Sequence, residues 1–176
     1  MTELNTEKNF SSNETLRDIL LFTIWSVVLC LCALTLKSYY IAGRPPLWDN
    51  LSYQKQTLQF LTICLEGNWI EALNEVWGSM TPAYLISLSI SFLLFGLNPI
   101  SPYIVSAFFS AACMAAVYLL AQEIGASKRT AFWGVISFTL LPNFIYQNFL
   151  QTRNDFPLAF FITLSWVFLL RGIKRK

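Results

Sequence analysis

Four long stretches of the sequence contain no charged residue. They cover Ile19–Leu36, Val76–Gln122, Thr130–Thr152 and Phe156–Leu170. A helix crosses the roughly 30 Å hydrocarbon core of a bilayer with about 20 apolar residues, so these stretches predict several membrane-spanning helices. The last stretch is the shortest, but Arg171 beyond its end can reach the headgroups and allow this helix to span as well.

The second stretch is too long for one helix and contains its own breaks. Gly96, Pro99 and Pro102 follow one another closely, and proline interrupts a helix because it lacks an N–H and clashes with the preceding turn. We therefore expect a span that begins at Ser101. Residues 82–97 form either a further span or a helix in the interface, because their serines gather on no single helical face.

The placement of Lys and Arg agrees with two topologies. Four spans with the N-terminus inside place eight basic residues inside and four outside, namely Lys37, Arg44, Lys55 and Arg153. Five spans with the N-terminus outside place nine inside and leave Lys8, Arg17 and Arg153 outside. Both satisfy the preference for basic residues on the cytoplasmic side. Four spans put Asp49 and Asp155 on one face of the membrane, whereas five put them on opposite faces.

The segment between the first two stretches, Lys37–Glu75, is too polar to span a membrane. Apolar residues nevertheless recur in it at helical intervals, first as Leu51, Leu58, Leu61 and Leu65 and then as Trp69, Leu73, Val76 and Trp77. We expect short amphipathic helices at the bilayer surface, with the tryptophans at headgroup depth. Such helices anchor a loop even where they have no other role.

The composition agrees with a membrane protein and argues against several functions. Hydrophobic residues make up 55% of the 176 residues and charged residues 12%, against about 25% in soluble domains. There is no histidine, the commonest metal ligand, and the four cysteines form no CxxC pair, so we interpret them as small buried hydrophobes. Basic residues are too few for nucleic-acid binding. No ionisable residue lies inside a predicted span, which argues against a transporter or channel.

Two acids lie at predicted membrane edges. The stretch RPPLWDNLSY, residues 44–53, holds Asp49 between an aromatic and an amide neighbour, and Asp155 stands two residues before Pro157. Each acid fits the cap of a helix that starts there. Each also fits a site at the membrane surface, and the two roles are compatible.

The order of these features resembles a known family of membrane enzymes. The motifs that carry the resemblance are, in chain order, PPLWDNLSY, TPAYL, LLFG, YLLAQEIG, ASKR, LPN and RNDFPL. From about residue 19 onward, the chain is similar to the amino-terminal part of polytopic GT-C glycosyltransferases, the protein O-mannosyltransferase and lipid A aminoarabinose transferase superfamily. The resemblance implies that residues 82–97 form a juxtamembrane helix, which favours four spans over five.

The expected fold is therefore all-α, a multi-pass integral membrane protein with four transmembrane helices plus interfacial helices in the first outer loop. Residues 1–18 are expected to form a cytoplasmic segment and residues 19–176 a GT-C-like module. Within this module we expect an outer loop over 37–100 and spans over about 19–40, 101–122, 130–150 and 156–171.

The resemblance implies an active site at the outer face. Asp49, in the first outer loop, would be the catalytic base or the group that orients the acceptor, and Asp155, before the last span, the supporting acid. A carboxylate partly removed from water beside aromatic rings is a stronger base than one in bulk water. The expected phosphate- and substrate-binding residues are Arg44, Lys55, Arg153 and Tyr53. Relatives often carry His or Glu where this chain has Met80 and Thr81, so we predict no metal and keep a divalent metal as an alternative.

The predicted function is a membrane glycosyltransferase, or its truncated or split amino-terminal portion. It would transfer a sugar from a polyprenyl-phosphate donor to an acceptor hydroxyl on the outer face. The alternative is a non-catalytic membrane subunit or relic of the same fold that binds lipid or a partner. The expected partners are the lipid-linked donor, membrane lipids and a second polypeptide that carries the missing spans, because relatives contain more spans. The expected location is a cell membrane such as the bacterial inner membrane.

Overall fold

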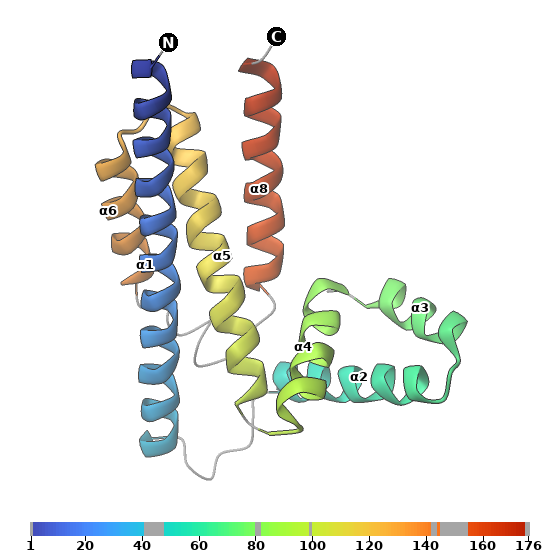
Figure 1. Ribbon diagram of the computed structural model, residues 1–176. Coiled ribbons are helices and arrows are strands. Elements are labelled where there is room, and N and C mark those ends of the chain that lie inside the picture. Colours follow the sequence, from blue (N-terminus) through green and yellow to red (C-terminus); the bar gives the residue numbers. More distant parts are fainter. Residues whose placement is uncertain are drawn as a thin grey trace.

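The computed structural model describes the backbone of residues 2–40, 48–79, 82–98, 100–141, 144 and 155–174, with side chains described for 14–35, 52–79, 82–98, 100–141, 144 and 156–174. In these ranges the chain is helical and contains no strand (Figure 1). The helices are α1 (Thr2–Tyr40), α2 (Trp48–Leu65), α3 (Trp69–Gly78), α4 (Pro82–Phe95), α5 (Ser101–Glu123), α6 (Lys128–Thr139) and α8 (Asp155–Lys174).

Helices α1, α5, α6 and α8 form an upright bundle around α5, which packs most extensively against α8 and α1. Both chain termini lie at one end of this bundle, here called the terminal end, where Glu123 closes α5 and Lys128 opens α6 (Figure 1). Helices α2, α3 and α4 lie at the opposite end, here called the loop end, where α5 begins at Ser101. The helices of the first loop, α2, α3 and α4, are thus separated from the chain termini by the length of the bundle.

Three described segments are long and apolar enough to cross a membrane: Glu14–Thr35, Ser101–Glu123 and Phe156–Lys174. Large apolar side chains are exposed along these helices, for example Ile24, Phe108 and Phe161, where lipid replaces water as the surroundings. The predicted all-α, multi-pass membrane architecture is therefore confirmed. Helix α4 is apolar but shorter. Helix α6 covers the first half of the span expected over 130–150, and beyond Leu141 only Phe144 of that range is described.

The turn between α4 and α5 explains why the second uncharged stretch is not one helix. Gly96 has φ of 79°, a left-handed conformation that favours glycine, and it ends α4. The side chain of Asn98 accepts hydrogen bonds from the backbone N–H of Ile100 and Ser101 and donates one to the carbonyl of Phe95. Pro102 stands in the first turn of α5, where its missing N–H costs nothing.

Small polar groups join α1 to α5 inside the bundle. The hydroxyl of Ser26 donates to the carbonyl of Ala107 at 2.7 Å, and the thiol of Cys30 lies 3.5 Å from the carbonyl of Tyr103. Small side chains let two helices approach closely in a membrane, and their polar atoms hydrogen-bond across the contact. The interpretation of the cysteines as small buried residues is confirmed for Cys30 and Cys113, but it is wrong for Cys32, which is exposed, and Cys64 is only half-buried.

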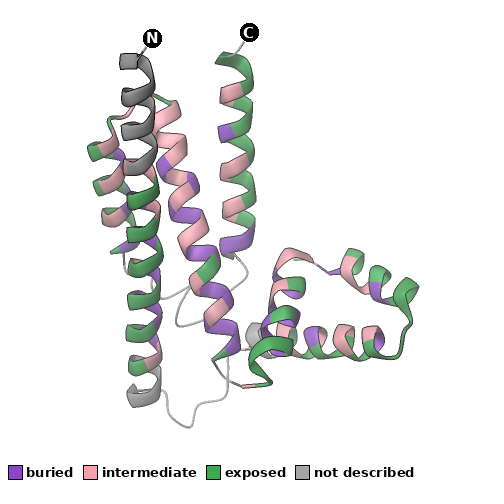
Figure 2. Ribbon diagram, viewed as in Figure 1, coloured by how far each residue is buried: buried purple, intermediate pink, exposed green. Residues whose placement is uncertain are grey.

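Figure 2 shows where the described buried residues lie, and many of them belong to two apolar cores. The larger, here called the loop-end core, joins α1, α4, α5 and α8, and its members are Leu29, Cys30, Ala33, Tyr84, Leu88, Phe92, Tyr103, Val105, Phe109, Cys113, Phe144 and Phe156. The smaller, the terminal-end core, joins α1, α5 and α6 through Phe22, Met114, Tyr118, Ala131 and Val135. The loop-end core therefore contains residues of α4 and of the start of α8, and both helices pack on α5.

Candidate active site

The two predicted catalytic acids stand at the starts of two helices. Asp49 is the second residue of α2 and Asp155 the first residue of α8, so both lie in a first helical turn, where the helix dipole favours negative charge. The side chains of both acids lie outside the described residues, as do Arg44 and Arg153 entirely. Their roles stay predictions, and the described neighbours show what surrounds them.

Tyr53 connects the start of α2 to the bundle. It lies one helical turn after Asp49, and its half-buried side chain packs against the loop-end core. Its ring meets that of Tyr84 edge to face, with centroids 5.7 Å apart and planes at 72°. This is a favoured geometry for aromatic pairs. The beginning of α2 is thus held close to α4.

Phe156 fixes the start of α8 in the same core. It directly follows Asp155, is 3% exposed, and packs edge to face on Phe144 with centroids 5.0 Å apart. Since Tyr53 packs against the core to which Phe156 belongs, the beginnings of α2 and α8 share one packing unit. The two positions are more than a hundred residues apart in the sequence.

Tyr84 lies near the candidate site, and no role was predicted for it from the sequence. It comes from the first turn of α4, is 3% exposed, and lies between Tyr53 and Tyr103. Burial, with smaller contributions from these two phenols, raises the pKa of Tyr84 above its ordinary value. Burial therefore favours the neutral, protonated form of the Tyr84 phenol. The sequence contained a signal for it, because Tyr84 is the aromatic residue of the TPAYL motif.

Lys55 is the predicted phosphate ligand whose side chain is described. It is exposed and forms no ion pair with any described residue. It stands two positions after Tyr53, about 200° around the helix, because successive helical residues are rotated by about 100°. Lys55 therefore does not share the face of α2 that packs on the loop-end core.

The described acids of the first loop do not form a metal site. Glu66 and Glu75 stand apart from each other on α3 and its approach, and Glu71 accepts a hydrogen bond from the side-chain amide of Asn68. Among the residues that the structure describes, no three His, Cys, Asp or Glu side chains gather in a way that would hold a metal ion.

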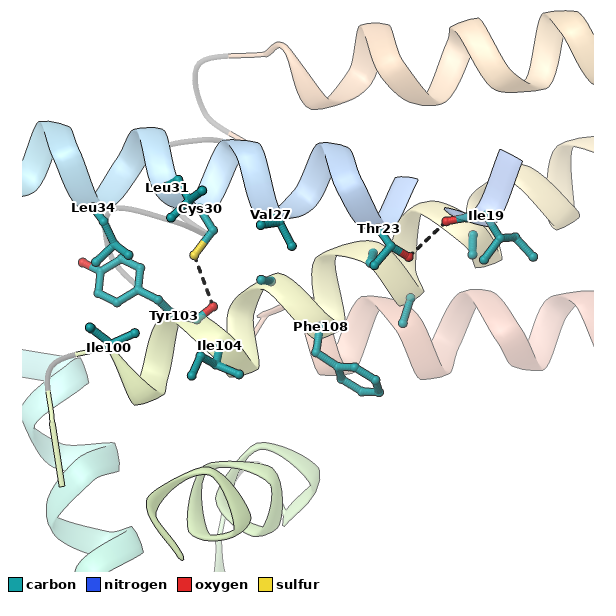
Figure 3. A pocket seen from close by; sticks show the side chains of 14 residues that line it. Ile19, Thr23, Val27, Cys30, Leu31, Leu34, Ile100, Tyr103, Ile104 and Phe108 are labelled. Carbon is teal, nitrogen blue, oxygen red and sulfur yellow. Dashed lines mark hydrogen bonds between the residues drawn. The ribbon is translucent and has the colours of Figure 1, made fainter. Parts of the chain in front are cut away.

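A long apolar groove of about 550 Å³ runs between α1 and α5 (Figure 3). Leu34, Ile100 and Tyr103 line it at the loop end, and Ile19 lines it towards the terminal end. Alanines spaced four residues apart, at 107, 111 and 115, form part of its wall on α5. Tyr103 belongs to both the groove and the loop-end core, so the groove begins next to the candidate site.

A comparison with known protein families shows to which family the chain belongs. Residues 79–176, more than half of its length, match the family model described as dolichyl-phosphate-mannose-protein mannosyltransferase. The chain belongs to this mannosyltransferase family. No curated protein and no solved structure matches it. The resemblance to GT-C glycosyltransferases is thereby confirmed, since this is a family of membrane glycosyltransferases of the GT-C type.

The family match covers only part of the candidate site. It includes Tyr84, Arg153 and Asp155, and it begins after α2 and Asp49. Asp155 thus lies inside the matched range and Asp49 outside it, and the roles of both acids stay predictions.

Polar contacts that the sequence did not predict lie at the other end of the bundle. Asp18, which directly precedes the first uncharged stretch, is 6% exposed, and one of its carboxylate oxygens accepts a hydrogen bond from the hydroxyl of Tyr118 at 2.7 Å. Glu123 accepts one from Arg171 at 2.7 Å, which joins the ends of α5 and α8. These pairs lie far apart in the sequence, and no local pattern predicts them.

Proposed function

We propose that the chain is the amino-terminal part of a membrane glycosyltransferase. It transfers a sugar from a polyprenyl-phosphate donor to an acceptor hydroxyl, and the family description points to mannose and to a protein acceptor. The observation that carries the proposal is the family match over residues 79–176, which contains α8 and the loop-end core residues of α4 and α5.

The two acids are proposed to face one site at the loop end of the bundle. Asp49 precedes Tyr53 by four residues, which is about 6 Å along the helix. Asp155 is adjacent to Phe156, and both aromatic residues pack in or against the loop-end core. This shared packing supports a common site, because it limits how far apart the two helix starts can lie.

Each residue of this site has a proposed role. Asp49 takes the proton from the acceptor hydroxyl as the sugar is transferred, and Asp155 orients the acceptor or supports the charge of the site. Arg44 and Arg153 neutralise the departing lipid phosphate with charge-assisted hydrogen bonds. Tyr53 forms an aromatic wall, and Lys55, which lies on another face of α2, contributes a longer-range positive charge.

The loop end is proposed to lie on the outer side of the membrane. Four described basic residues, Lys128, Arg129, Arg171 and Lys174, stand at the terminal end of the bundle, and Arg17 lies one turn below the start of the first candidate span. Lys55 is the basic residue of the described parts of α2, α3 and α4. Basic residues favour the cytoplasmic side, so this distribution supports an inner terminal end and an outer loop end.

The polyprenyl tail of the donor is proposed to lie in the groove between α1 and α5. The groove is apolar, runs along the bundle, and begins at Tyr103 beside the loop-end core. A donor seated there would hold its tail within the hydrocarbon layer and present its phosphate at the membrane surface, where the predicted acids and arginines lie.

The test is a transfer assay in membranes that contain the full chain. The donor is polyprenyl-phosphate mannose with a labelled sugar, and the readout is label in protein. We expect Asp49→Asn and Asp155→Asn each to reduce the rate of transfer by about 10²-fold or more, which is the loss expected when a general base is removed. The control is Glu71→Gln, which removes an acid from exposed α3 and should leave transfer unchanged.

Two outcomes would overturn the proposal. Full activity in Asp49→Asn or Asp155→Asn would remove that residue from the mechanism. No transfer by the wild-type chain, when it is correctly inserted, supplied with donor and combined with a polypeptide that carries the further spans, would favour a non-catalytic subunit or relic of the same fold.

A further inference from the structure

A hollow of about 330 Å³ lies between α1 and α6 at the terminal end of the bundle, away from the candidate active site. Five of its lining residues are charged, three basic and two acidic, and the remaining three are apolar. The lining therefore carries a formal charge of 3 − 2 = +1. The arrangement of these charged and apolar residues indicates what binds there.

Both acids in the hollow are already paired within the protein. One oxygen of the Asp18 carboxylate accepts a hydrogen bond from Tyr118, and the other lies 3.2 Å from the guanidinium of Arg17. The carboxylate of Glu14 accepts a hydrogen bond from the ammonium of Lys128 at 2.8 Å. These pairs hold α1 against α5 and α6, and they partly satisfy the negative charge of the hollow.

The basic residues, in contrast, keep unused capacity for an anion. Arg129 is exposed and forms no ion pair or hydrogen bond with a described residue. The side chain of Arg17 is 67% exposed, and its contacts with Asp18 use only part of the five N–H donors of a guanidinium. Arginine is well suited to phosphate because its planar group donates two parallel hydrogen bonds.

Each basic residue stands one helical turn before an apolar residue of the same lining. On α1, Arg17 precedes Leu21, and on α6, Arg129 precedes Trp133. Leu21 is 41% exposed and Trp133 is 58% exposed, so both present apolar surface beside the hollow. Lys128 and Phe132 repeat the same spacing. The hollow thus has a charged rim above an apolar floor, about 6 Å apart along each helix.

This layering matches the boundary between headgroups and acyl chains of a bilayer. The first candidate span begins at Glu14, so the rim of the hollow lies where the protein leaves the hydrocarbon layer. Tryptophan concentrates at this depth, and basic pockets between helices on the cytoplasmic side attract anionic lipids. A free phosphate ion would bind to the charged rim but would gain nothing from contact with the apolar floor.

We propose that this hollow binds an anionic phospholipid. The lipid phosphate accepts hydrogen bonds from Arg17 and Arg129, and the start of the acyl chains lies along Leu21 and Trp133. A lipid held there would bridge α1 and α6, which also meet through Phe22 stacked on Phe132 and through the hydrogen bond from Lys128 to Glu14. The proposal is independent of the glycosyltransferase assignment.

The test is native mass spectrometry of the purified full chain, delipidated in detergent. Phosphatidylglycerol and phosphatidylcholine with the same acyl chains are added in separate titrations. We expect phosphatidylglycerol to bind at least about fivefold more tightly, the factor expected for one basic residue near an anionic surface. Arg129→Gln should remove most of this preference, and Arg17→Gln should weaken it too.

The control variant is Lys174→Gln, which removes one positive charge from the same end of the bundle but outside the hollow. It should keep the preference for phosphatidylglycerol. Circular dichroism of each variant shows that the fold is retained, and Arg129→Gln is suitable because Arg129 has no described partner to lose.

Three results would overturn the proposal. The first is equal binding of both lipids by the wild-type chain. The second is an unchanged preference for phosphatidylglycerol in both single variants, Arg129→Gln and Arg17→Gln. The third is displacement of phosphatidylglycerol by millimolar inorganic phosphate as effectively as by excess lipid, which would identify the hollow as a site for free phosphate.

Discussion

The ring of Tyr53 in α2 meets the ring of Tyr84 in α4 edge to face, with centroids 5.7 Å apart. Tyr84 is buried in the core that also contains Phe156 at the start of α8. A helix of the first loop and the last described helix are therefore connected through one apolar cluster, the loop-end core. This connection supports the proposal that Asp49 and Asp155 face one site.

Removal of the Tyr84 ring should loosen this cluster. We expect Tyr84→Ala to lower the free energy of unfolding by about 3–5 kcal/mol, because it leaves a cavity where an aromatic ring was fully packed. Tyr84→Phe keeps the ring and should cost about 1 kcal/mol. The measurement is chemical unfolding of the protein in mixed micelles. Equal losses for the two variants would contradict a packing role for the ring.

The buried carboxylate of Asp18 should depend on Tyr118. Tyr118→Phe removes the hydroxyl that donates to Asp18 at 2.7 Å, and we expect a loss of about 1–3 kcal/mol because a buried charged acceptor loses its partner. Ser165→Ala is the control, since that exposed hydroxyl bonds only to a carbonyl of its own helix. The same unfolding measurement applies, and a loss in the control as large as in Tyr118→Phe would refute the prediction.

Filling the groove between α1 and α5 should impair donor binding. Ala111→Phe places a ring in the groove, and we expect the KM for the polyprenyl-phosphate donor to rise about tenfold with little change in kcat, because the tail makes the same contacts before and during the reaction. Leu158→Phe adds bulk at an exposed position of α8 and serves as the control. An unchanged KM in Ala111→Phe would show that the tail lies elsewhere.

Helix α3 should lie with one face in the membrane. Leu73 is 58% exposed and Trp77 is 82% exposed on the same side of this helix, whereas Glu71 lies on the opposite side. We expect a single cysteine at position 73 to resist a water-soluble maleimide and one at position 71 to react within minutes. Both cysteines are introduced after the native cysteines are replaced. Equal labelling at both positions would mean that α3 projects into water.

The features that the sequence predicted correctly are those set by local chemistry. The break before α5 follows from Gly96, Asn98 and Pro102, which form their turn within a few residues of one another. The amphipathic α3 follows from the spacing of its tryptophans, and the spans follow from the absence of charge. Such signals require no knowledge of the distant chain.

The features that the sequence did not predict depend on contacts between distant segments. Asp18 and Tyr118 are a hundred positions apart, and hydropathy assigned Asp18 only a place at the end of a span. The extent of α6 was also not predicted. It ends at Thr139, whose hydroxyl accepts a hydrogen bond from the indole N–H of Trp25 in α1. Apolar character continues past this point, so hydropathy alone gave no reason for the helix to stop.

The candidate site was predicted from motif order more than from geometry. The structure adds the shared core of Tyr53 and Phe156, and it places Lys55 on a different face of α2 from Tyr53. The helical periodicity of α2 was sufficient to show that these two side chains lie on different faces of the helix. The common core of Tyr53 and Phe156 could be seen only in the packed bundle.

The proposed shared site is tested most directly by finding out on which side of the membrane each of the two acids lies. Single cysteines at Asn50 and Asn154, in a background without the native cysteines, are treated with a membrane-impermeant maleimide from each side in turn. The account predicts that both label from the outer side, next to Asp49 and Asp155. Labelling from opposite sides would contradict it, because the two acids could then share no site.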